Sequence, residues 1–162
     1  MYKIKDSLPL EARINFYYAF VYPHLCQNVI VWGNTGYSNL KPLIVQHKRI
    51  IRNLTNSGYL DHTSPLFASL GLLKFEDIYK YHVLIFMFKA IKNYQYSINH
   101  SLNIRYRNKA VPVFQRLALT QRSVSYAGPT LWNKLPNSIS SIDSFFVFKR
   151  KLKQYFISQY DN

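Results

Sequence analysis

The chain has 162 residues, of which 48% are hydrophobic and 17% aromatic, and its 21 lysines and arginines outnumber 7 aspartates and glutamates, for a formal charge of +14. This apolar content excludes a disordered basic tail, and the length suits one folded domain with or without an appendage. Charge of this size predicts a polyanionic partner, which could be nucleic acid, an anionic membrane or an acidic protein.

The sequence has no recognisable signal peptide or membrane-spanning run, and this favours an intracellular protein. No apolar run approaches the roughly 20 residues that a membrane-spanning helix needs, and residues 1–10 lack the apolar core of a signal peptide. The single cysteine, Cys26, cannot form an internal disulfide, which fits a reducing compartment. We therefore expect a cytoplasmic or nuclear location and no transmembrane segment.

Residues 1–93 predict a bundle of helices. Ser7 and Pro9 have the chemistry of a helix start, and the first helix is expected to end near Tyr22 because Pro23 breaks the hydrogen-bond ladder. The apolar stretch at residues 25–32 predicts a second helix that turns away from the first.

The next helix has two contrasting faces. Ser38 is a plausible cap, and residues 56–58 (Asn-Ser-Gly) end the helix. One face is apolar at helical spacing: Leu40, Leu43, Ile44, His47, Ile50, Ile51 and Leu54. The other side is basic: Lys41, Lys48, Arg49 and Arg52.

Two more helices complete the bundle. A short helix is expected from Thr63 to about Leu70, and a longer one over residues 75–93, after Gly71. A stripe on the longer helix comprises Phe75, Ile78, Tyr79, His82, Phe86 and Lys89. Because residues 83–88 are apolar on all sides, this helix is predicted to be central.

Residues 94–122 predict a basic irregular connector, since helical periodicity fails there. Residues 110–114 are the only strand-like run and could form a weak hairpin, although Pro112 interrupts it. Five cations of the connector are candidate nucleic-acid contacts: Arg105, Arg107, Lys109, Arg116 and Arg122.

Residues 123–162 predict a C-terminal extension with a terminal amphipathic helix capped by Ser144. Four residues of that helix are expected to face inward: Phe145, Phe148, Leu152 and Phe156. Trp132 follows an expected turn at Gly128-Pro129, and we interpret it as an anchor that packs the extension onto the helical body.

Catalytic and metal-binding motifs are not recognisable, so we predict neither kind of site. The seven carboxylates have no spacing that would converge on metal ions. His24 and Cys26 lack the further ligands of a zinc site, and residues 61–64 (Asp-His-Thr-Ser) fit a turn and helix cap better than a hydrolase triad. His47 and His82 lie on apolar stripes, which favours core or boundary positions.

Several stretches, read in order, resemble the region after the palm domain in non-LTR (LINE-type, jockey-like) retrotransposon reverse transcriptases. In the bundle they are Tyr17-Tyr18, Tyr22-Pro23-His24-Leu25, Val31-Trp32-Gly33, Leu40, Leu43, Gln46, Lys48, Ile51-Arg52, His62-Thr63 and Pro65-Leu66-Phe67. In the extension they are Ser125-Tyr126, Gly128-Pro129, Leu131-Trp132-Asn133, Leu135-Pro136, Phe148-Lys149 and Leu152-Lys153.

This resemblance implies a mainly α fold, with a thumb-like bundle over residues 1–93 and a post-thumb extension over residues 123–162. In that family the region grips template and primer, while the Mg²⁺-binding aspartates belong to the palm, so these residues would need no cofactor. We expect a noncatalytic fragment of an RNA-directed DNA polymerase that binds RNA or DNA, with the remainder of a reverse transcriptase as a further partner. The alternative is a helical scaffold that binds an acidic protein or an anionic membrane surface.

Overall fold

The fold was obtained as a computed structural model, which describes residues 8–92, 121 and 123–160. The described residues form helices and no strand, which confirms the prediction of a mainly α protein. The connector at residues 94–122, with its expected weak hairpin, lies outside the described residues apart from Gln121.

The first three helical segments follow one another without a break. They are α1 (Leu10–Phe16), the π-helix η1 (Tyr17–Val21) and α2 (Tyr22–Cys26). The prediction that Pro23 ends the helix is wrong, because the wider π turn precedes it and Pro23 then occupies the first turn of α2, where its missing N–H is tolerated. Pro9 is the N-cap of α1, and Ser7 lies outside the described residues.

The real break falls at Asn28, whose positive φ of 53° turns the chain into α3 (Val29–Trp32). The predicted second helix at residues 25–32 is therefore wrong in its bounds: its first residues belong to α2. Asparagine is among the few residues that adopt this left-handed conformation at low cost, which explains the position of the break.

The helix α4 (Tyr37–Thr55) has the two faces predicted for it. Ile44, His47, Ile51 and Leu54 are buried, and the helix ends at Asn56, again with a positive φ, of 55°. Gly36 is the N-cap instead of Ser38, which lies in the first turn.

Next come α5 (Thr63–Ser69) and the central helix α6 (Phe75–Lys92), joined by a turn at Gly71. Buried side chains surround most of α6, as predicted. Within the expected stripe, however, Phe86 is only half-buried and Lys89 is exposed, because α6 contacts neighbours on several sides and not along a single face.

The C-terminal part consists of α9 (Val124–Asn133), α10 (Asn137–Ser140) and α11 (Phe145–Ile157). The expected turn at Gly128-Pro129 is instead inside α9. A Cβ atom on Gly128 would lie 2.7 Å from Met87 Sδ, so the glycine lets α9 approach α6 closely. On α11, Phe148, Leu152 and Phe156 are buried as predicted, whereas Phe145 is half-buried.

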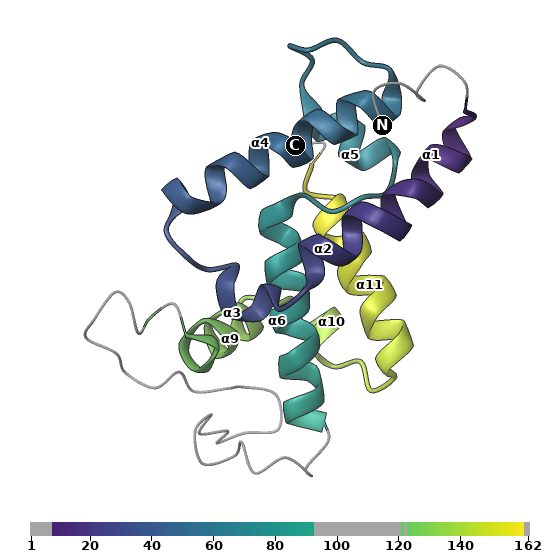
Figure 1. Ribbon diagram of the computed structural model, residues 1–162. Helices are drawn as coiled ribbons and strands as arrows, with labels where there is room; N and C mark the ends of the chain where they lie inside the picture. Colours follow the sequence, from purple (N-terminus) through teal and green to yellow (C-terminus); the bar gives the residue numbers. More distant parts are fainter. Residues whose placement is uncertain (1–7, 93–120, 122, 161–162) are drawn as a thin grey trace.

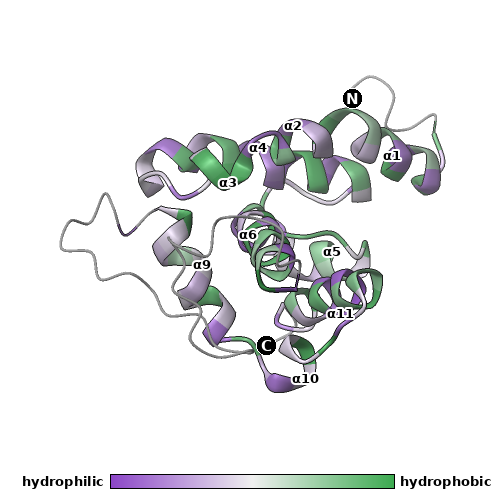
Figure 2. Ribbon diagram, turned by 90° about the horizontal axis from the view of Figure 1, so that it is seen from below, coloured by the Kyte–Doolittle hydropathy of each residue, from purple (hydrophilic) through white to green (hydrophobic). Residues whose placement is uncertain are grey.

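These helices form two layers. Helices α1 to α4 lie in one layer, and α5, α6, α9, α10 and α11 lie in the other (Figure 2). In Figure 1, α6 runs through the middle, with α9 on one side and α11 on the other. The larger core cluster joins side chains from α2, α3, α4, α6, α9 and α11, so the C-terminal part shares a core with the bundle.

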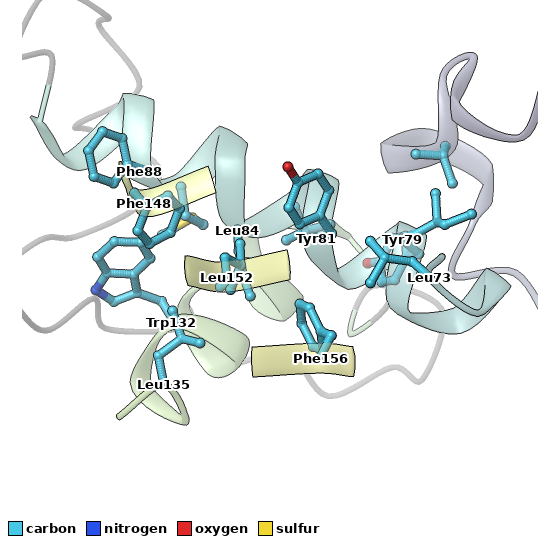
Figure 3. Close-up of a cluster of buried hydrophobic side chains, with 14 of the residues drawn as sticks. Leu73, Tyr79, Tyr81, Leu84, Phe88, Trp132, Leu135, Phe148, Leu152 and Phe156 are labelled. Carbon is cyan, nitrogen blue, oxygen red and sulfur yellow. The ribbon is translucent and has the colours of Figure 1, made fainter. Parts of the chain in front are cut away.

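Trp132 has the buried position expected of an anchor. Its side chain is 1% exposed, and its ring centroid lies 5.8 Å from that of Phe148 on α11. Figure 3 shows the indole beside Phe148, which in turn stacks on Phe88 of α6 at 4.4 Å. The three aromatic rings thereby connect α9, α11 and α6.

Candidate nucleic-acid interface

The four predicted cations of α4 lie outside its buried stripe: Arg49 is opposite the stripe, and Lys41, Lys48 and Arg52 lie along its edge. We call Lys41, Lys48, Arg49 and Arg52 the α4 basic face. Spacings of seven and eleven residues are close to two and three turns, so Lys41, Lys48 and Arg52 form one line, flanked by Arg49. At 1.5 Å per residue the line is about 17 Å long, or roughly five steps of a duplex at 3.4 Å per step.

The residues of the α4 basic face differ in exposure and in structural role. Lys41 and Arg49 are exposed, whereas Lys48 and Arg52 are half-buried. The Nε of Arg52 donates to the carbonyl oxygen of Asp61 at 3.0 Å, which ties the loop after α4 to the helix. Arg52 therefore has a structural role in addition to any role in binding.

Carboxylates are scarce around the α4 basic face. The helix contains no aspartate or glutamate. Asp61 is in the following loop, and its Oδ2 accepts the Gly58 N–H at 2.6 Å. Within the described part of the chain, no carboxylate lies at ion-pair distance from the four cations. Within the described residues these four cations are therefore not paired with a carboxylate.

A polar groove of about 410 Å³ opens beside this face. Its lining includes Gln46, Arg49, Arg52, Asn53, Ser57 and Tyr59. Tyr59 is 71% exposed, so its ring is available to a ligand in the groove. Sequence reasoning missed Gln46 and Asn53, although their spacing of three and four residues from Arg49 places them on its side of the helix.

The histidine behind the α4 basic face does not add to its charge. His47 is 2% exposed, and its Nε2 lies 2.9 Å from the buried Tyr17 hydroxyl. Burial lowers its pKa from 6.5 to about 4, so the ring is neutral at pH 7. Burial also raises the Tyr17 pKa. The predicted core position of His47 is confirmed.

Other candidate residues have local roles or fall outside the described part. His62 is the N-cap of α5, and Thr63 and Ser64 form its first turn. No group of three or more potential metal ligands occurs among residues 8–92, 121 and 123–160. The connector cations lie outside the described residues: Arg105, Arg107, Lys109, Arg116 and Arg122.

No protein-family model matches the chain, and comparison with curated proteins and with solved structures gives no match either. Of the helices that the structure describes, none combines the length and the apolar character needed to cross a bilayer. Any functional conclusion therefore rests on the residues themselves.

Proposed function

We propose that this chain is a noncatalytic, thumb-like part of a retroelement reverse transcriptase and that it binds template–primer nucleic acid through the α4 basic face. The observation that supports binding is the line of Lys41, Lys48 and Arg52, flanked by Arg49, with no carboxylate at ion-pair distance in the described residues. The family assignment rests on the ordered sequence resemblance described above.

The α4 basic face would act on the sugar-phosphate backbone. Each cation that neutralises a phosphate releases condensed counterions, which favours binding at low salt. Contacts of this kind fix the position and orientation of a nucleic acid without reading its sequence. The polar groove beside Arg49 adds hydrogen-bonding side chains, and the chemistry of polymerisation would belong to a palm domain.

Salt dependence tests this proposal. We would measure the affinity for a fluorescein-labelled 20-base-pair RNA–DNA hybrid by fluorescence anisotropy between about 50 and 200 mM salt, over which proteins that bind through phosphate contacts lose much of their affinity. The test variant is Lys48→Gln/Arg49→Gln, which leaves Arg52 in place because that residue holds the loop. The slope of log affinity against log salt should flatten by roughly 1.4 to 1.8 units.

The matched control is Lys134→Gln/Lys151→Gln, which removes the same charge from two exposed positions away from α4, one just after α9 and one on α11. Equal slopes for the two double variants would remove α4 from the binding face. Anionic vesicles and polyglutamate serve as competitors. If they displace the hybrid as readily as unlabelled hybrid does, the scaffold alternative is favoured over nucleic-acid recognition.

A further inference from the structure

A second cationic surface lies where α6 and α11 meet near η1. Lys89 of α6 and Lys149 of α11 hold their Nζ atoms 5.3 and 5.6 Å from the centroid of the same Phe145 ring. One turn further along α11, Lys153 Nζ lies 3.2 Å from the Tyr18 hydroxyl. Two helices distant in sequence, α6 and α11, thus bring three ammonium groups together, and η1 adds the Tyr18 hydroxyl beside them.

We call Lys89, Lys149 and Lys153, with Tyr18, Phe145 and Phe146, the lysine–aromatic face. Within the described part of the chain, no carboxylate is at ion-pair distance from these three lysines, and their close partners are aromatic rings. Uncompensated like charges repel one another, and binding an anion relieves this repulsion.

His82 of α6, a neighbour of the lysine–aromatic face, is half-buried and provides no negative charge. Burial lowers the His82 pKa, and the positive charge of Lys149 lowers it further, so the imidazole is neutral at pH 7. Its Nε2 has no hydrogen-bond partner within the described residues. The lysines consequently dominate the electrostatics of the face.

The lysine–aromatic face also presents exposed aromatic rings next to its lysines. Phe146 is 81% exposed, which is unusual for a phenylalanine, and Tyr18 is also exposed. Phe146, Lys149 and Lys153 follow at spacings of three and four residues, so they share one side of α11. An exposed ring one helical turn before Lys149 and two turns before Lys153 suits an unpaired base whose neighbouring phosphates reach these lysines, whereas bases in a duplex are already stacked.

We infer that the lysine–aromatic face binds single-stranded nucleic acid, with Lys149 and Lys153 on phosphates and Phe146 stacked on a base. This inference rests on the proposed function and adds a second, strand-specific contact surface to it. A template strand that is paired at the α4 basic face would then be held here where it is unpaired.

The test uses the full chain, a labelled 20-nucleotide oligo(U) and the 20-base-pair hybrid. Loss of one stacked base should make the Phe146→Ala variant bind oligo(U) roughly 5- to 150-fold more weakly, with hybrid affinity within twofold of wild type. The Lys149→Gln/Lys153→Gln variant should flatten the salt slope for oligo(U) by roughly 1.4 units. Lys151→Gln is the control, because it is exposed on another side of the same helix.

Three outcomes would overturn the inference. One is an oligo(U) affinity of Phe146→Ala within twofold of wild type, and another is an equal loss on oligo(U) and on the hybrid. The third is weaker binding of Phe146→Ala to phosphatidylserine vesicles with oligo(U) unaffected, which would assign the face to a membrane surface. If Lys48→Gln/Arg49→Gln still flattens the hybrid slope, the proposed function survives any of these results. If the wild-type chain binds neither probe, both fail.

Discussion

Acid should destabilise this protein through one buried histidine. His47 is stacked on Tyr17 with ring centroids 5.8 Å apart, and its edge meets the Phe67 ring at 5.0 Å. Its Nδ1 has no hydrogen-bond partner in the described residues. An imidazolium carries N–H on both nitrogens, so the protonated ring has a buried Nδ1 donor without an acceptor in the described residues, and its Nε2 cannot accept from the Tyr17 hydroxyl.

The size of the effect follows from the shift in pKa. Above pH 6.5 the ring is neutral in both the folded and the unfolded chain, and the folded state has its full stability. As the pH falls below 6.5 the unfolded chain takes up a proton, while the folded chain does so only near pH 4. Between these values the free energy of unfolding should decrease by about 3 kcal/mol, at 1.36 kcal/mol for each pKa unit.

Urea denaturation followed by circular dichroism from pH 4 to pH 7.5 would measure this loss. The reference is His47→Gln, whose amide can still bond to Tyr17 but does not titrate. His82 is present in both proteins, so its contribution cancels in the difference. Parallel curves of unfolding free energy against pH for wild type and His47→Gln would refute the assignment of acid sensitivity to His47.

Four further substitutions test packing, hydrogen bonding and backbone conformation. Trp132→Ala should lower the free energy of unfolding in urea by roughly 3 to 5 kcal/mol, and a loss below about 1 kcal/mol would contradict an anchoring role. Asp77→Ala should cost about 2 kcal/mol, because it leaves the Tyr160 hydroxyl without its acceptor at 2.7 Å. Lys80→Ala removes only the partly exposed ion pair with Asp77 and should cost less than about 1 kcal/mol. A larger loss for Lys80→Ala than for Asp77→Ala would contradict the importance of the Asp77–Tyr160 hydrogen bond. Gly71→Ala should cost about 1 kcal/mol in thermal unfolding, since φ is 61° there and space is not limiting; an unchanged midpoint would exclude backbone strain.

The parts of the fold predicted correctly from sequence depend on local patterns. The apolar run at residues 83–88 placed α6 at the centre, and helical periodicity separated the buried and basic faces of α4. Asn56 ends α4 as its residue type and position indicated. In each case one helix contains all the information that the prediction needs.

Packing between helices explains what the sequence did not reveal. The π turn that carries the chain through Pro23 begins at Tyr17, which is fully buried and stacks on His47 of α4. A turn predicted at Gly128-Pro129 became part of α9 because the glycine allows close contact with Met87 of α6. Both outcomes depend on a partner far away in sequence, which local propensities cannot specify.

The same distinction applies to the two candidate surfaces. The α4 basic face comes from a single helix and could be listed from the sequence. The lysine–aromatic face needs η1, α6 and α11 to meet, which the spacing within one helix cannot show. Sequence spacing gave no reason to place Lys89 beside Lys149 and Lys153, yet all three contact aromatic rings of the same surface.

Basic residues on the outer side of a helix are not by themselves evidence of binding, because any amphipathic helix puts its charged residues there. The distribution of acids is more informative. In the described part of the chain the carboxylates are Glu11, Asp61, Glu76, Asp77 and Asp143, and none lies within α4 or α11. Surfaces that serve only solubility function well with both signs interspersed. Two separate surfaces whose cations form no ion pair with a described carboxylate therefore favour a polyanionic ligand over simple solvation. The two salt-slope experiments measure the contribution of each surface independently.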